Sequence, residues 1–306
     1  MVFIGILIAC VLFGVVPIII MNLVNKNNID DYKKLVNNNE WIILVMEVFS
    51  FVCFCIMVSG ISAFLQELFN LPHYICSIFA GVVCALMLLM KFSGMEKINS
   101  ILVPLIIIGI VLLVTKEYDP NAFKVDDAVE ISKGYTSSWL VSSVLYASYN
   151  MLILLPVLTN FKRYNLSKSQ IFFTGFFVSV FLTIMSLIIY NVCNIFYPQI
   201  MSVEIPTLKL AMMHGTFVKI FYCVVILSSI LTTAFSTGYS FLCMKNVKNY
   251  NRNVIIICVL AVLFSGIGFS KLINTLFPLF GYLGVLQIIL VLIMQKKNGK
   301  GVKWKK

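Results

Sequence analysis

Three consecutive polar residues, Ser148-Tyr149-Asn150, lie near the middle of 138–158, a segment otherwise long and apolar enough to cross a bilayer. Hydrocarbon supplies no hydrogen-bond partners, so polar groups at that depth must face protein, water or a ligand. Pro156 follows and cannot donate a backbone hydrogen bond, which weakens the helix locally. Many secondary transporters place their substrate at such an interrupted helix. The pattern therefore predicts a broken helix whose polar residues bind substrate. Alternatively, Ser148 bonds to a carbonyl of its own helix and its two neighbours make interhelical contacts.

A second group of polar side chains follows one face of the segment 216–243. Ser229, Thr232, Thr233 and Ser236 recur at spacings of three and four residues, which aligns them along a helix. Hydroxyl oxygens are hard ligands that suit a sodium ion when backbone carbonyls complete its shell. Thr232, Thr233 and Ser236 are therefore candidate ion ligands. Close helix packing through small residues explains the same stripe without an ion.

Carboxylates are rare in the apolar segments, where only Glu47 and Glu67 occur. Both lie near segment ends, so they can anchor the helices at the membrane interface. Glu204, with Pro206, belongs to the connection 196–215, in which we expect a short helix. Glu67 and Glu204 are candidate gate or proton sites, because an acid within a membrane protein can relay protons.

The composition places the chain among integral membrane proteins. It has 306 residues, of which 60% are hydrophobic and 11% charged, whereas soluble domains average about 25% charged residues. We predict an all-α fold with nine transmembrane helices. The nine segments are 2–24, 41–68, 73–90, 98–115, 138–158, 170–195, 216–243, 254–269 and 274–294.

The net charge of +11 does not indicate nucleic-acid binding, because the basic residues lie between the apolar segments. Seventeen of the 23 Lys and Arg residues fall on one side when alternate connections are grouped, and six fall on the other. Basic residues stay on the cytoplasmic side, so the tail 295–306 is predicted to be cytoplasmic. The partners that these features indicate are the lipid bilayer and a small solute.

Catalysis and metal binding find no support in the residue pattern. The cysteines lie in or beside apolar segments, and the two histidines have no metal-binding or catalytic spacing. No carboxylate dyad or Ser-Lys arrangement occurs at membrane depth. We predict no enzyme activity, no catalytic residue, no resident metal, and no cofactor beyond a coupling ion, Na⁺ or H⁺.

Several short motifs, taken in order, resemble the YkvI-like bacterial membrane proteins, a branch of the amino acid–polyamine–organocation transporter superfamily. They are SGISAFLQELFNLP at 59–72, SYN at 148–150, EIPTLKLA at 204–211, TTAFSTGYS at 232–240 and FPLFGYLG at 277–284. Each motif alone is weak, and the ordered set spans most of the chain.

The resemblance implies a LeuT-like helical bundle of two inverted repeats in a single membrane domain, 1–306. The segment 1–115 would be the remainder of the first repeat and 138–294 the second. The segment 138–158 would then be the sixth core helix and 216–243 the eighth, which supplies ion ligands in LeuT-like transporters. The nine segments would be core helices 2 to 10, so we expect the first core helix to be missing.

The function that these features predict is ion-coupled transport of a small polar solute, such as an amino acid or amine, by alternating access across a bacterial inner membrane. A chain without the first helix would be expected to transport poorly alone. The alternative is a membrane receptor or complex subunit that keeps the transporter fold and senses a solute without moving it.

Overall fold

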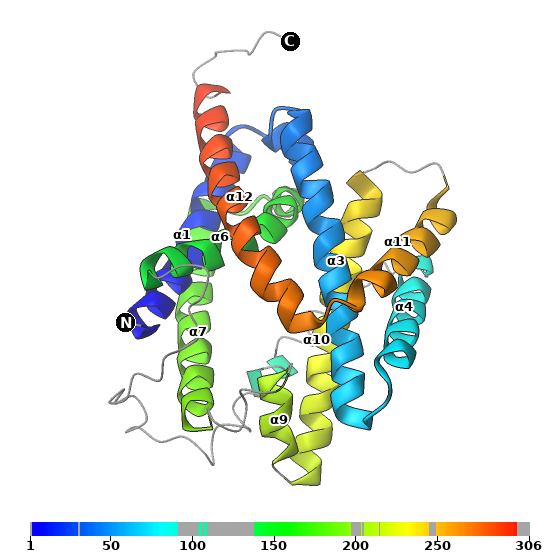
Figure 1. Ribbon diagram of the computed structural model, residues 1–306. Coiled ribbons are helices and arrows are strands. Elements are labelled where there is room, and N and C mark those ends of the chain that lie inside the picture. Colours follow the sequence, from blue (N-terminus) through cyan, green and yellow to red (C-terminus); the bar gives the residue numbers. More distant parts are fainter. Residues whose placement is uncertain are drawn as a thin grey trace. The chain divides into compact units, whose positions relative to one another are not determined.

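The protein is described from a computed structural model that covers residues 2–29, 31–90, 104–105, 107–108, 138–196, 203, 205–213, 215–244 and 249–298. In these ranges the chain is helical, with short connections (Figure 1). The α-helices are α1 (Val2–Lys26), α2 (Tyr32–Leu35), α3 (Glu40–Phe69), α4 (His73–Leu89), α6 (Trp139–Asn160), α7 (Lys168–Ile195), α9 (Pro206–Met212), α10 (Thr216–Met244), α11 (Tyr250–Ser265) and α12 (Phe269–Asn298). A 3₁₀ helix, η2 (Phe161–Tyr164), follows α6.

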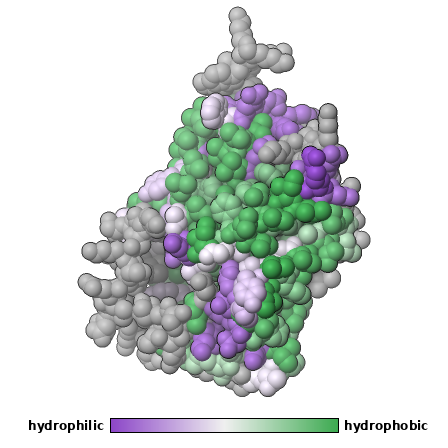
Figure 2. Space-filling view, turned by 45° about the vertical axis from the view of Figure 1, so that its right-hand side comes forward, coloured by the Kyte–Doolittle hydropathy of each residue, from purple (hydrophilic) through white to green (hydrophobic). Residues whose placement is uncertain are grey.

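Five of these helices are long and apolar enough to cross a membrane: α1, α3, α7, α10 and α12. Three shorter apolar helices lie in α4, α6 and α11. In the described ranges, helices thus occupy eight of the nine predicted segments, and 98–115 lies mostly outside those ranges. Figure 2 shows broad continuous areas of hydrophobic residues on the face in view. The chain is a multi-pass membrane protein, because such helices satisfy their own backbone hydrogen bonds and expose apolar side chains.

The boundary between α11 and α12 differs from the predicted one. We expected the connection between 254–269 and 274–294, but α11 ends at Ser265 and α12 begins at Phe269. Gly268 has a φ of 95°, a conformation that is costly for other residues and that turns the chain there. The pair Gly266 and Gly268, which lies inside the predicted segment 254–269, was the signal for this turn in the sequence.

The chain forms two compact units, each assembled from separated segments. Unit 1 comprises 1–46, 128–187 and 275–306, and unit 2 comprises 47–127 and 188–274. Each unit therefore combines segments from both predicted repeats. The inverted symmetry that would relate the repeats stays a prediction.

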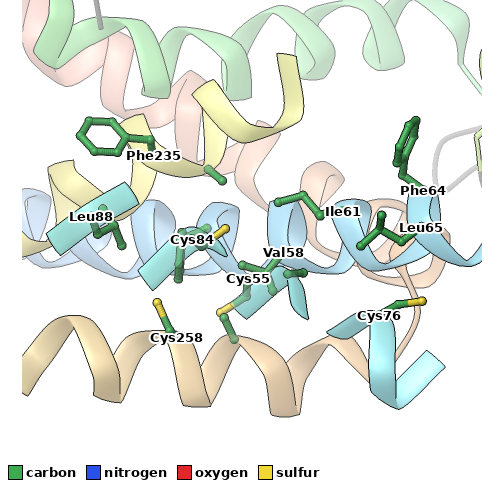
Figure 3. Packing of buried hydrophobic residues seen from close by; sticks show 14 of the residues in the cluster. Cys55, Val58, Ile61, Phe64, Leu65, Cys76, Cys84, Leu88, Phe235 and Cys258 are labelled. Carbon is green, nitrogen blue, oxygen red and sulfur yellow. The ribbon is translucent and has the colours of Figure 1, made fainter. Parts of the chain in front are cut away.

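The core of unit 2 lies among α3, α4, α10 and α11 (Figure 3). Phe54, Val58 and Leu88 are completely buried there, and Tyr250 of α11 donates a hydrogen bond of 2.9 Å to the carbonyl of Leu88. Figure 3 shows Cys84 of α4 and Cys258 of α11 within this packing. Eight of the nine cysteines have side chains that the structure describes; these eight are free thiols, and seven of them are buried. They pack there as small apolar side chains.

Unit 1 is built around α1 and α6, and its core includes the fully buried Ile20, Val24 and Leu152. Ser179 of α7 donates a hydrogen bond of 2.6 Å to the carbonyl of Cys10 in α1, which ties α7 to the same core. The short helix α2 contributes the buried Tyr32 and Leu35. These two of its four residues are buried, so α2 packs against the rest of unit 1.

Candidate functional site

The predicted break at Ser148-Tyr149-Asn150 is absent: α6 is continuous from Trp139 to Asn160. The Oγ atom of Ser148 donates to the Val144 carbonyl at 2.7 Å, and the Asn150 amide donates to the Tyr146 carbonyl at 2.8 Å. Each polar group thus finds its partner one turn back in the same helix, which removes the need for an interruption. Pro156 removes a single amide donor, and α6 continues past it.

The continuous helix alters what these residues can do. Because α6 has no internal N-terminus at Ser148, no free amides or helix dipole are available there for a carboxylate. The side chains remain available for contacts. Ser148 is 4% exposed, while Tyr149 and Asn150 are half-buried.

Ser148 and Tyr149 both lie against α12 within unit 1. The backbone carbonyl of Ser148 faces Gly284, where an added β-carbon would lie 2.5 Å from that oxygen. One turn earlier, an added β-carbon at Gly281 would lie 2.8 Å from the Cβ atom of Leu145. The two glycines therefore let α6 and α12 approach closely.

Aromatic rings extend this contact on both sides of Ser148. The ring of Tyr149 lies 4.6 Å from that of Phe277 in α12 and 5.4 Å from that of Tyr146, centroid to centroid. Tyr146 in turn meets Phe13 of α1 edge to face at 5.7 Å. These rings form an aromatic wall beside the half-buried amide of Asn150. Such a wall offers apolar surface and π faces, and Asn150 offers a polar group.

The predicted hydroxyl stripe is present on α10 in unit 2. The Ser229 carbonyl accepts hydrogen bonds from Thr232 and Thr233 at 3.0 and 2.9 Å, and Ser236 donates to the Thr232 carbonyl at 2.9 Å. Thr237 and Ser240 repeat the pattern toward the end of the helix. Each hydroxyl proton is therefore committed to the helix backbone. The lone pairs of the same oxygens remain available as acceptors.

Glu67 ties two parts of unit 2 together. Its carboxylate accepts a hydrogen bond of 3.2 Å from the backbone amide of Ile205, the residue that precedes α9. Leu208 of α9 is fully buried, and Tyr222 of α10 is hydrogen-bonded to Thr207. The short helix expected in 196–215 is thus present and held by three contacts. Glu204, the other candidate gate or proton site, lies outside the described residues.

A polar contact that the sequence analysis missed joins α2 to α12. The Gln287 amide donates a hydrogen bond to the Tyr32 hydroxyl, and Gln287 is only 3% exposed. The side-chain oxygen of Gln287 is buried without a hydrogen-bond partner in the described structure. Burial raises the pKa of the Tyr32 hydroxyl above its ordinary value. A lone Gln in the apolar segment 274–294 was the signal, because an amide at that depth needs a partner.

Among the described residues, no group of three or more His, Cys, Asp or Glu side chains could hold a metal ion. His73 contacts Ser77, whose hydroxyl lies 3.2 Å from Nδ1 of His73 and 2.9 Å from the Ser62 hydroxyl. These contacts join α3 to α4. His214 lies outside the described residues.

Comparison with solved structures decides the fold. The chain matches the crystal structure of a manganese transporter of Eremococcus coleocola, in complex with an aromatic bis-isothiourea compound, with a TM-score of 0.63. The match covers 96% of this chain and 72% of that one, at 14% sequence identity. The chain has the LeuT-like transporter fold. The predicted all-α helical bundle is confirmed.

Sequence comparison identifies a bacterial membrane protein of low sequence identity to this chain. The chain is 22% identical over 241 residues to the membrane protein YkvI of Bacillus subtilis (strain 168). That alignment covers 75% of this chain and 66% of the relative, slightly less than two thirds of its length. No model of a known protein family matches the chain.

Proposed function

We propose that the protein is a secondary transporter of a small polar solute of the amino acid or amine class, driven by a sodium or proton gradient. The observation that carries this proposal is the fold, which is shared with a transporter over 96% of the chain. The similarity to YkvI is consistent with it, as is the predicted place in the amino acid–polyamine–organocation superfamily.

The proposed substrate site is the turn of α6 that contains Ser148, Tyr149 and Asn150. Because the Asn150 amide donates to its own helix, its side-chain oxygen is left to accept a hydrogen bond from the solute. The tyrosine rings offer π faces to which an ammonium group is attracted. The continuous helix gives no corresponding site for a carboxylate. An amine or the amino end of an amino acid therefore suits this wall best.

The proposed coupling-ion ligands are Thr232, Thr233 and Ser236. Each hydroxyl proton is bonded to a backbone carbonyl, which turns the oxygen into an acceptor toward any additional partner. A row of such oxygens suits a hard cation such as sodium. Glu67 is the proton alternative, since a carboxylate that holds α9 would release the Ile205 amide when protonated. Coupling to sodium and coupling to protons would thus depend on different residues, so substitutions at those residues can distinguish the two ions.

The proposed transport cycle uses relative motion of the two compact units. Each unit buries apolar side chains of its own, among them Phe54 and Leu88 in unit 2 and Ile20 and Leu152 in unit 1, so each can move as a body. In this scheme, binding of the solute at α6 and of the ion at α10 changes the preferred arrangement of the units.

The test is uptake by purified protein in proteoliposomes, with radiolabelled amino acids and polyamines supplied under a sodium gradient, a proton gradient or neither. Gradient-dependent, saturable accumulation is expected for at least one solute. Radioactive manganese forms a further arm, because the structural neighbour is a manganese transporter. Saturable binding without accumulation under either gradient would reject transport and support a solute-sensing receptor instead.

A further inference from the structure

An open and almost wholly apolar groove lies between α3 and α10 in unit 2, with a volume of about 250 Å³. Four residues between Phe64 and Phe69 supply the α3 side, and five between Lys219 and Leu227 supply the α10 side. Leu65 and Cys223 are buried in this groove. Neither the candidate substrate residues of α6 nor the hydroxyl stripe of α10 belongs to its lining.

The side chains at the rim of the groove are exposed on the outer surface of α3 and α10. Phe69, Ile220 and Val224 have exposed fractions of 60%, 58% and 58%. Both helices are long and apolar enough to cross the membrane, so such side chains face lipid. The segment from Lys219 to Leu227 extends about 12 Å along the helix axis. The hydrocarbon core of a bilayer is about 30 Å thick, so the groove extends through most of one leaflet.

One end of the groove is cationic. Lys219 is the charged residue in its lining, and it lies in the first turn of α10, close to where α3 ends at Phe69. The amides at the start of α10 add partial positive charge, because first-turn N–H groups have no acceptor within the helix. Phe69 and Phe217 are exposed near the same helix ends. An anionic group above an apolar groove is therefore the complementary ligand.

We propose that this groove binds an anionic phospholipid. One acyl chain lies between α3 and α10, and the phosphate lies at the Lys219 ammonium and the first amides of α10. The apolar lining suits the acyl chain, and the positive end suits the phosphate. A free phosphate lacks the acyl chain and an apolar helix lacks the negative charge, so neither matches both features. The bound lipid fills the space between the two helices at the membrane boundary.

The test is native mass spectrometry of the full chain in detergent, with phosphatidylglycerol and phosphatidylcholine of identical acyl chains. The protein is expected to retain phosphatidylglycerol about fivefold better, as a lysine at an anionic membrane surface suggests. Lys219→Gln should remove that preference. Lys271→Gln is the matched control, because Lys271 is an exposed lysine in the first turn of α12, and it should keep the preference.

A second variant tests the groove itself. Val224→Trp places a large ring in the groove at an exposed position, and it should reduce retention of both lipids without lowering the melting temperature. Val259→Trp, on α11 and 54% exposed, is the control that should retain both. The proposal is overturned if both lipids bind equally to the unmodified protein, if Lys219→Gln keeps the preference, or if Val224→Trp retains lipid as well as Val259→Trp does.

Discussion

Gly284 of α12 lies directly against the backbone carbonyl of Ser148 in α6, so closely that a methyl group at Gly284 would lie 2.5 Å from that oxygen. The contact joins two helices that are far apart in the sequence, at Ser148, the first residue of the proposed substrate site. It makes the position of that site depend on α12.

Gly284→Ala should therefore destabilise unit 1. The added methyl group clashes with backbone rather than with a mobile side chain, and overpacking of this kind costs about 1–3 kcal/mol. The melting temperature in detergent measures the effect. Gly215→Ala is the control, because no atom lies within 4 Å of a methyl group there. Equal melting temperatures for the two variants would show that α6 and α12 are not in this contact.

Asn150→Ala should impair uptake more than it impairs stability. Its hydrogen bond to Tyr146 is exposed and local, so its loss should cost less than about 1 kcal/mol. If the side-chain oxygen accepts a hydrogen bond from the solute, KM should rise roughly tenfold, the equivalent of about 1.4 kcal/mol. Asn22→Ala removes the same type of bond, 2.9 Å to the Ile18 carbonyl in α1, and should leave KM unchanged. An equal rise of KM in Asn150→Ala and Asn22→Ala would show that Asn150 does not bind the solute.

Thr233→Val should raise the sodium concentration required for half-maximal uptake. Valine keeps the shape of threonine and removes the oxygen that would bind the ion, while the lost bond to Ser229 is local. A shift of about tenfold is expected for one ligand, measured from uptake against sodium concentration. Thr183→Val on α7 removes a matching bond to Ser179 and should cause no shift. Sodium-independent uptake would instead direct attention to Glu67.

Glu67→Ala should loosen the start of α9. Loss of the carboxylate leaves the Ile205 amide without this charge-assisted acceptor, which is worth about 1.5–3 kcal/mol. Hydrogen–deuterium exchange of the peptide that contains Ile205 should become at least about tenfold faster. Gln66→Ala, at the exposed neighbouring position, is the control. Unchanged exchange in Glu67→Ala would show that the buried Leu208 alone fixes α9.

Tyr32→Phe should cost about 1–3 kcal/mol, because it leaves the buried Gln287 amide without its partner. The double variant Tyr32→Phe/Gln287→Leu should recover much of that loss, since no polar group is then left unpaired. The pKa of Tyr32 is raised in the folded state, so the neutral hydroxyl favours folding. This contribution is complete below the ordinary tyrosine pKa of about 10 and declines as the pH rises above it. Melting temperatures from pH 8 to 11 should therefore fall less in Tyr32→Phe than in the unmodified protein.

The sequence by itself determined the membrane class and most of the helices. A backbone in hydrocarbon must satisfy its hydrogen bonds locally, so long apolar segments such as 41–68 predict helices without knowledge of their neighbours. The hydroxyl stripe from Ser229 to Ser236 was predictable for the same reason, because helical spacing alone places these side chains on one face.

The tertiary structure decided which residues meet and how polar groups are satisfied. The break expected at Ser148 is replaced by a continuous helix, since local hydrogen bonds and the close approach of Gly284 accommodate the polar residues. The contacts of Glu67 with Ile205 and of Gln287 with Tyr32 join residues 138 and 255 positions apart. A polar residue in an apolar segment indicates that a partner is needed, but only the packing of the helices decides which partner it finds.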